Sequence, residues 1–324
     1  MNLKDIEAPV AHHLEEFNHF FKSQMLSEVA LLNLIIKYLT KKKGKQVRPL
    51  LVFLSAQLCG KVSNRTHIGA AMVELLHTAT LIHDDVVDLS TERRGMRSIN
   101  AEWNNKIAVL IGDYLLARGL LSALDTKEFE ILQCTSKSVR RMSEGELLQI
   151  EKSKRTNTDE KIYYKIISFK TASLLSTCCE VGAISATSDT SMHEALSNFG
   201  ENLGMAFQIR DDIFDYQDNG KIIGKPVGND LKEKKITLPL IYALATAPKH
   251  LSKEIHKKVK EKKINQKEIK TIIEFVNHYG GIAYSEQKAK EFSEKAVDYI
   301  IPLKDSPAKT SLIKFAEFVI ERDS

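Results

Sequence analysis

Hydrophobic side chains recur at three- and four-residue steps along most of the chain, a spacing typical of helices with one buried face. We predict helices over 25–40, 67–88, 105–124, 161–184, 198–216 and 238–245. Loops are predicted at 41–45, 90–98, 153–159 and 218–235. No strand–helix alternation, fixed-period repeat or Pro- or Ser-rich linker interrupts the pattern. We therefore expect one large all-α domain that spans 1–324.

The composition agrees with long helices in an ordinary globular protein. The 324 residues include only 15 Gly and 7 Pro, so few turns are expected. The 4 cysteines include no Cys-x-x-Cys pair and provide no disulfide framework, which suggests a reducing compartment. No apolar run reaches the length of a membrane span, and the polar start of the chain does not resemble a signal peptide. We expect a cytoplasmic protein without a transmembrane segment.

The charge balance says little about partners. The net charge of +5 suits an anionic small molecule as well as a nucleic acid. Lysines crowd residues 249–270, but no aromatic residues interleave them. We interpret this segment as a solvated helical face and expect no nucleic-acid partner.

Two aspartate motifs of the form DDxxD each end an apolar helical pattern. The first is Asp84, Asp85 and Asp88, and the second is Asp211, Asp212 and Asp215. Steps of three and four residues place such carboxylates on one helix face. A single motif could be a coincidental helix end, but two copies on separate apolar helices favour a binding site. Oxygen ligands without His or Cys indicate Mg²⁺ bound together with a substrate phosphate.

Basic residues flank both aspartate motifs. Arginine presents a fixed fork of donors that suits phosphate oxygens. The candidates are Lys45 and Arg48 before the first motif, Arg93 and Arg94 after it, Lys170 on an apolar helix, and Lys225 and Lys235 after the second motif. Together they indicate two anion sites, one bridged by metal and one held directly by Lys and Arg.

These segments resemble, in their order along the chain, the trans-isoprenyl diphosphate synthases of the polyprenyl synthetase family, especially medium- and long-chain members such as octaprenyl diphosphate synthase. The matching stretches are 44–49, 74–94, 144–149, 170–171, 204–216, 224–239 and 320–322. The resemblance implies an all-α bundle around a central cavity (the isoprenoid synthase type), a homodimer, and a Mg²⁺-dependent prenyltransferase. Its substrates would be isopentenyl diphosphate and an allylic diphosphate, with farnesyl diphosphate as the expected primer.

The resemblance also assigns roles to residues. It implies metal ligands at Asp84, Asp85, Asp88, Asp211, Asp212 and Asp215; allylic diphosphate contacts at Arg93, Lys170, Lys225 and Lys235; an isopentenyl diphosphate pocket at Lys45, Arg48, His77 and Arg94; and groups near the developing carbocation at Thr171 and Gln208. Glu146 and Gln149 would contact these residues, and His83 is interpreted as structural. Gln46 and Lys234 depart from the residues common in the family at their positions.

The chemistry implied is departure of diphosphate from the allylic substrate, which leaves a carbocation. Metal ions and basic residues stabilise the charge that develops on the leaving group. An apolar cavity shields the cation from water. The double bond of isopentenyl diphosphate then attacks, and the departing diphosphate is the expected acceptor of the released proton.

Product length is predicted from the helix that precedes Asp84. Thr80 and Ala79 lie about 6–7.5 Å back along that helix, and both are small, so the growing chain should pass them. Leu76, Val73 and Met72 lie about 12–18 Å back and could form a floor with Leu116 and Leu120. We expect a product of about C30–C40, and a shorter one if a tyrosine replaces Ala79.

Several alternatives remain at this point. One is a short-chain geranylgeranyl or farnesyl diphosphate synthase. A class I terpene synthase usually has a different second metal motif, and it would lack the segment 44–49, as would a head-to-head synthase. A non-catalytic partner subunit should have lost aspartates, whereas all six are present.

Overall fold

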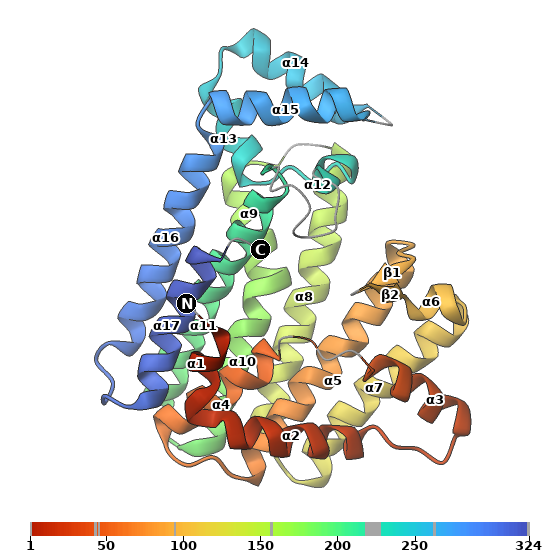
Figure 1. Cartoon of the computed structure of the whole chain (residues 1–324), viewed down its shortest axis with the longest axis vertical. Coiled ribbons are helices and arrows are strands. Elements are labelled where there is room, and N and C mark those ends of the chain that lie inside the picture. Colours follow the sequence, from red (N-terminus) through yellow and green to blue (C-terminus); the bar gives the residue numbers. More distant parts are fainter. Residues whose placement is uncertain are drawn as a thin grey trace.

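The computed structural model describes residues 2–41, 44, 46–93, 95–155, 158–217, 228–261 and 264–322, with the side chains of 154 and 155 left aside. Helices account for most of this part of the chain (Figure 1). They are α1 (Leu3–Glu7), α2 (Ala11–Gln24), α3 (Ala30–Leu39), α4 (Val47–Cys59), α5 (Asn64–Val87), α6 (Ile99–Glu102), α7 (Asn105–Asp125), α8 (Phe129–Arg155), α9 (Glu160–Ile167), α10 (Ser173–Ala186), α11 (Thr190–Phe214), α12 (Asn229–Lys232), α13 (Leu238–Thr246), α14 (Lys249–Lys260), α15 (Gln266–His278), α16 (Gly281–Ile300) and α17 (Pro307–Glu321).

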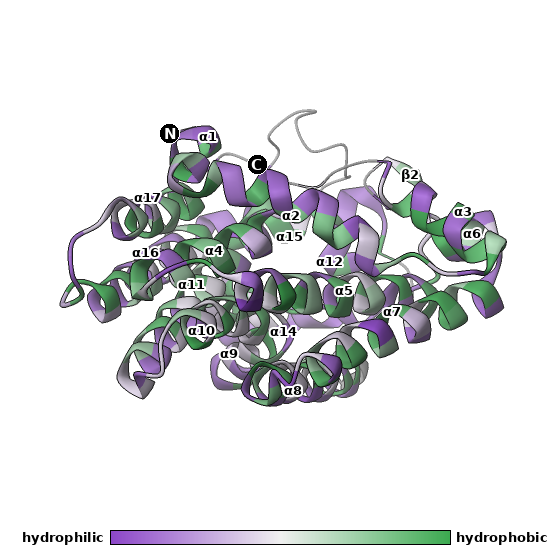
Figure 2. Ribbon diagram, turned by 90° about the horizontal axis from the view of Figure 1, so that it is seen from below, coloured by the Kyte–Doolittle hydropathy of each residue, from purple (hydrophilic) through white to green (hydrophobic). Residues whose placement is uncertain are grey.

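The long helices stand side by side, while α14 and α15 lie across one end of the bundle (Figure 1). Helix α10 packs against α4, α5, α8 and α11, which makes it the centre of the fold. Its residues are almost all apolar or small, as expected of a helix buried on every side. Hydrophobic residues prominent on α4, α5 and α10 contrast with polar stretches at the periphery (Figure 2).

The predicted fold class is confirmed, and several boundaries differ. The segment predicted as a helix over 25–40 becomes helical only at Ala30, because Met25 closes α2 and the chain turns before α3. The predicted loop at 90–98 contains a two-stranded antiparallel hairpin, β1 (Glu92–Arg93) and β2 (Met96–Arg97). The predicted loops at 153–159 and 218–235 overlap the end of α8 and the whole of α12.

Helix α7 is long and apolar enough to cross a bilayer by length and composition alone. One such helix is weak evidence for a membrane span. Its inner face packs on α5, where Ala108, Ile111 and Leu115 are buried. Its outer face exposes several large apolar side chains.

The segment predicted as one helix over 161–184 contains a wide turn at Ser168–Ala172, between α9 and α10. Here the Ser173 N–H donates to the Ser168 carbonyl, five residues back, which is the hydrogen bond of a π-turn. Two glycines permit the close packing of this turn. A Cβ at Gly145 of α8 would lie 2.9 Å from the Lys170 nitrogen, and one at Gly204 of α11 would lie 2.4 Å from the Ala172 Cα.

Polar contacts fix the same π-turn from both sides. Arg141 of α8 pairs with Glu201 of α11 at 2.7 Å and donates to the Ser168 hydroxyl at 2.9 Å. The Ser168 hydroxyl donates in turn to Glu201. The π-turn is therefore held between α8 and α11, and it carries Lys170 and Thr171.

Candidate active site

A cavity of about 850 Å³ lies among the helices and is lined by residues from both halves of the chain. Its polar wall includes Asp84, Asp85, Lys170 and Thr171. Its apolar wall includes aromatic and aliphatic residues such as Phe17, Phe21, Met25, Phe207, Phe315 and Phe318. The cavity thus has both charged and apolar lining residues.

The first aspartate cluster forms where α5 ends. Leu89 takes a left-handed conformation with φ +53°, which stops the helix directly after Asp88. Asp85 is buried, Asp84 is half-buried and Asp88 is exposed. Burial raises the pKa of the Asp84 carboxyl, and the neighbouring Lys170 partly offsets this effect.

The hairpin after α5 returns Arg93 to this cluster. Gly95, with φ +67°, lies between the two strands. Arg93 then donates hydrogen bonds to both oxygens of the Asp85 carboxylate, with Nη2–Oδ1 and Nε–Oδ2 distances of 2.7 Å each. Arg93 is therefore paired with Asp85 in this structure, whereas the resemblance implies that it contacts the allylic diphosphate.

The second aspartate cluster forms where α11 ends, and each of its carboxylates has a protein donor. Asp212 is buried and accepts hydrogen bonds from the Tyr163 hydroxyl and the Gln208 amide, each at 2.7 Å. Asp215 accepts from the backbone N–H groups of Asn229 and Asp230 at 2.9 and 3.0 Å. Burial raises the pKa of both carboxyls.

The third carboxylate of this cluster, Asp211, pairs with Arg322. The Arg322 guanidinium also lies over the Phe207 ring, 4.0 Å from its centroid, and donates to the Phe207 carbonyl at 3.1 Å. Burial lowers the pKa of Arg322, and the Asp211 charge opposes that shift. Asp211 therefore links the end of α11 to the segment that follows α17.

The π-turn connects the two aspartate clusters. Lys170 and Thr171 line the large cavity and also a second cavity of about 120 Å³ that contains Asp212, Asp230 and Lys235. The Thr171 hydroxyl donates to Gln208 at 2.7 Å, and Lys170 pairs with Glu146. The resemblance implies that Glu146 contacts residues such as Lys170, and this ion pair is present; the substrate-binding role of Lys170 stays a prediction.

Electrostatic contacts also cross between the clusters. Burial raises the pKa of Asp230 to about 6, and Lys170 is among the cations that oppose this rise. Burial alone would lower the pKa of Lys235, but Glu233, Asp230 and Asp88 outweigh it and raise that pKa. Lys170 therefore influences carboxyls beside both clusters, and Asp88 of the first cluster influences Lys235 beside the second.

Of the other predicted site residues, two line the large cavity and three lie outside the part of the chain that the structure describes. Arg48, on the first turn of α4, and His77 on α5 line the large cavity. Lys45, Arg94 and Lys225 lie outside the described residues. His83 packs on Gly112 of α7, and its Nε2 lies 3.4 Å from Asp113 Oδ1.

The predicted chain-length residues divide between two faces of α5. Thr80 lines the large cavity, and Thr80, Leu76 and Val73 line a small void of about 10 Å³ between α5, α8 and α10. Ala79 instead packs in an apolar cluster with side chains of α3 and α7, because adjacent residues point about 100° apart on a helix. Met72 is fully buried, and its sulfur accepts from Thr135 at 3.4 Å. Leu116 and Leu120 pack against the same core cluster as Met72 and Val73.

Sequence reasoning assigned no role to Tyr163, Asp230 or Arg322. Asp230 and Arg322 fall within stretches that matched the family, so the signal was present. Tyr163 gave no signal, since a tyrosine on an amphipathic helix resembles an ordinary packing residue. All three contact or face the second cluster.

The donor set fits a hard divalent cation. The described side chains at the two helix ends offer carboxylate oxygens, the ligands that Mg²⁺ and Ca²⁺ prefer. Asp84, Asp212, Asp215 and Asp230 all have raised pKa values, with burial as the largest cause. A cation between the clusters would compensate the buried negative charge.

Comparisons with known proteins identify relatives of this chain. The chain is 42% identical over 243 residues to the all-trans-nonaprenyl-diphosphate synthase (geranyl-diphosphate specific) of Rhodobacter capsulatus, covering 74% of each chain. It is 36% identical over 244 residues to the octaprenyl diphosphate synthase of Escherichia coli, covering 75% of this chain and 76% of that one.

A solved structure shows the same fold. The polyprenyl synthase of Caulobacter crescentus, crystallised with calcium and isoprenyl diphosphate, superposes with a TM-score of 0.92 at 31% identity, covering 100% of this chain and 98% of that one. The polyprenyl synthetase family profile matches residues 29–276. The chain, a prenyltransferase with the all-α isoprenoid synthase fold, therefore belongs to the polyprenyl synthetase family.

Proposed function

We propose that this protein condenses isopentenyl diphosphate head-to-tail onto an allylic diphosphate in a Mg²⁺-dependent reaction, to give an all-trans product of about C30–C40. The observation that carries the proposal is that the two aspartate clusters share Lys170, which lines the large cavity with Asp84 and Asp85 and a second cavity with Asp212. A single chain, 1–324, provides both clusters as one domain.

The residues divide into two anion sites. Asp84, Asp85, Asp88, Asp211, Asp212 and Asp215 would hold Mg²⁺, which stabilises the negative charge of the departing diphosphate. Lys170 and Lys235, with Arg93 and Lys225, would bind the allylic diphosphate. Arg48 and His77, with Lys45 and Arg94, would bind isopentenyl diphosphate.

The π-turn carries polar atoms that would lie beside the reacting carbon. The Thr171 hydroxyl donates to Gln208, so its oxygen lone pairs can face the developing allylic cation. The Gln208 amide is held by Asp212 and cannot turn freely. The apolar wall formed by residues such as Phe207 excludes water, which would otherwise capture the cation.

The face of α5 that carries Thr80 would set the length of the product. Thr80, Leu76 and Val73 line the small void of about 10 Å³, and Thr80, which also lines the large cavity, is too small to block a chain that extends this way. The names of the nonaprenyl and octaprenyl relatives support a medium or long product, while a short-chain synthase is the second candidate.

The deciding experiment is a divalent-dependent assay with isopentenyl diphosphate and either farnesyl or geranyl diphosphate as primer, followed by sizing of the dephosphorylated alcohols. We expect turnover only with Mg²⁺ and products of about C30–C40. Products that stop at C15 or C20 would favour the short-chain candidate, and cyclised products without isopentenyl diphosphate would favour a terpene synthase.

We also propose a cytoplasmic homodimer that pairs through α3 and α7. The outer face of α7 exposes Val109, Leu110, Leu121 and Leu124, and the segment around α3 exposes Leu26, Val29, Leu31 and Leu34. Both helices lie at the same edge of the molecule (Figure 2). An apolar face of this kind usually marks an interaction surface. Leu110→Glu should yield monomers by light scattering, whereas Leu147→Glu, an exposed leucine on α8, should leave dimers.

A further inference from the structure

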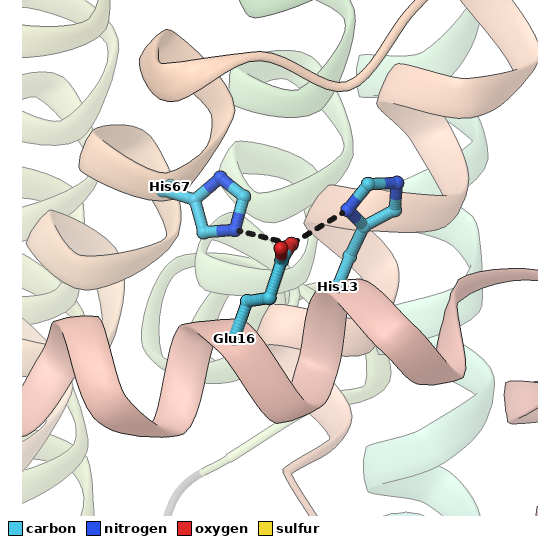
Figure 3. Close-up of side chains that lie close together, drawn as sticks. All are labelled: His13, Glu16 and His67. Carbon is cyan, nitrogen blue, oxygen red and sulfur yellow. Dashed lines mark hydrogen bonds and ion pairs between the residues drawn. The ribbon is translucent and has the colours of Figure 1, made fainter.

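A separate group of potential metal ligands, distinct from both aspartate clusters, lies between α2 and the start of α5 (Figure 3). It contains His13 and Glu16 of α2 and His67 of α5. None of the three is among the residues that line the large cavity. We propose that they bind a Zn²⁺-type transition-metal ion and join α2 to α5, independently of the proposed Mg²⁺ sites.

The ligand atoms converge on one point. His13 Nδ1 lies 3.3 Å from Glu16 Oε2, and His67 Nε2 lies 3.9 Å from the same oxygen. The potential ligand atoms of the three residues all lie within 4.8 Å of one another. A point equidistant from the three is at most about 2.4 Å from each, within a small side-chain rotation of the 2.0–2.2 Å that zinc requires.

The histidine rings are already oriented for binding. His67 Nδ1 lies 3.1 Å from the Ser63 carbonyl, which can only accept, so Nδ1 carries a proton and Nε2, which faces Glu16, is the atom available to a metal ion. This is the arrangement by which a backbone carbonyl usually orients a metal-binding histidine. Phe53 supports both rings: it stacks on His13 and meets His67 edge-on, with centroids 6.0 and 5.0 Å away.

The carboxylate is oriented as well. His12 Nε2 lies 3.2 Å from Glu16 Oε1, the oxygen that does not face the other two histidines. The side chains are 31% exposed for His13, 49% for Glu16 and 15% for His67, so an ion can enter from solvent and keep a water ligand. Two imidazoles and one carboxylate form a donor set that suits zinc and disfavours Mg²⁺.

Occupancy would tie α2 to the body of the protein. On α2, Phe17 lines the large cavity and meets the same Phe53 ring, 5.8 Å between centroids. The next residue, Asn18, accepts a hydrogen bond from the Gln46 side chain at 2.8 Å. The ion would therefore stabilise a wall of the cavity from outside without touching substrate.

The test uses the full chain, stripped of metal with a chelator and titrated with Co²⁺ in excess Mg²⁺ and without substrates. We expect one equivalent of Co²⁺ to give the intense visible absorption of a four- or five-coordinate site, displaced by Zn²⁺. His67→Ala and Glu16→Gln should each weaken binding at least tenfold, and the zinc-induced rise in melting temperature should vanish. His19→Ala, which removes an exposed histidine from the same helix, should bind as the unmodified protein does.

Equal binding by the unmodified chain and by folded Glu16→Gln protein would overturn the proposal, as would absorption typical only of six-coordinate Co²⁺. Because no substrate is present, neither outcome depends on the prenyltransferase reaction. A failed condensation assay would likewise leave this site untouched.

Discussion

The two aspartate clusters share a sequence pattern but differ in how the protein treats them. At the end of α11, Asp211, Asp212 and Asp215 each receive hydrogen bonds, from Arg322, from Tyr163 and Gln208, and from backbone N–H groups. At the end of α5, Arg93 donates hydrogen bonds to Asp85. Among the described residues, no side-chain hydrogen-bond donor is found for the carboxylates of Asp84 and Asp88.

The difference shows two ways to hold negative charge in a partly buried site. The second cluster is largely satisfied by the protein, so its geometry is fixed before any ligand arrives. The first cluster opens onto the large cavity and depends more on ions brought with the substrate. We therefore expect the second cluster to contribute to stability and the first to contribute mainly to catalysis.

Removing one aspartate from each cluster should have the largest effect and should test this division. Asp84→Ala and Asp211→Ala should each lower kcat by about 10³-fold or more, because diphosphate departure loses metal support. Their stabilities should differ. Asp84→Ala relieves repulsion within the cluster and should not destabilise the fold, whereas Asp211→Ala leaves Arg322 without its carboxylate partner and should cost about 1–3 kcal/mol.

Activity and urea unfolding of both variants, beside the exposed Asp298→Ala as a control, would measure these effects. Near-normal turnover in folded Asp84→Ala protein would contradict the metal-site assignment. Equal stability losses in the two variants would contradict the contrast between the clusters.

The face of α5 below the first cluster should set product length. Thr80→Tyr places a ring about 6 Å below Asp84 and should shorten the products to about C15–C20. Ala79→Tyr points instead into the packed contact with α3 and α7, so it should destabilise the protein by about 1–3 kcal/mol and affect length less. Sizing the products of both variants decides which face the chain follows; shorter products from Ala79→Tyr alone would reverse the assignment.

The hydroxyl of Tyr163 tests whether the hydrogen bonds of the second cluster contribute to stability. Tyr163→Phe removes one donor from the buried Asp212 carboxylate and should lower the free energy of unfolding by about 1–3 kcal/mol. The matched variant Tyr38→Phe loses an exposed hydrogen bond to the Arg97 carbonyl and should change stability by less than about 0.5 kcal/mol. Chemical denaturation compares the two, and indistinguishable midpoints would refute the proposed role of Tyr163.

The smallest expected effect concerns the loop beside the second cluster. Lys234 takes a left-handed conformation with φ +59°, which explains why glycine is common at this position in the family. Lys234→Gly should relieve about 1 kcal/mol of strain and raise the melting temperature slightly without changing kcat. A lower melting temperature would show that the Lys234 hydrogen bond to the Lys260 carbonyl outweighs the strain.

The fold class and the two aspartate clusters could be predicted from the sequence because both depend on local spacing. The helix that carries Asp84 ends within one residue of its predicted end. Less local features could not be predicted. The π-turn depends on glycines of two other helices, and the pairing of Arg322 with Asp211 joins residues far apart in the chain. Periodicity alone could not tell which way Ala79 and Thr80 point, because both faces of α5 are apolar.

The π-turn at Ser168–Ala172 has a consequence for how sequences of this kind can change. A π-turn contains one residue more than the α-helical turn it replaces. Deleting a single residue there would restore a regular helix and leave the core of α10 in place, yet it would rotate α9, the helix directly before the turn, by about 100° relative to α10. Lys170 and Thr171 could no longer both serve the two cavities. A related chain with that one-residue gap would keep its fold and lose this chemistry, so gaps at 168–172 in an alignment would separate active members from inactive ones.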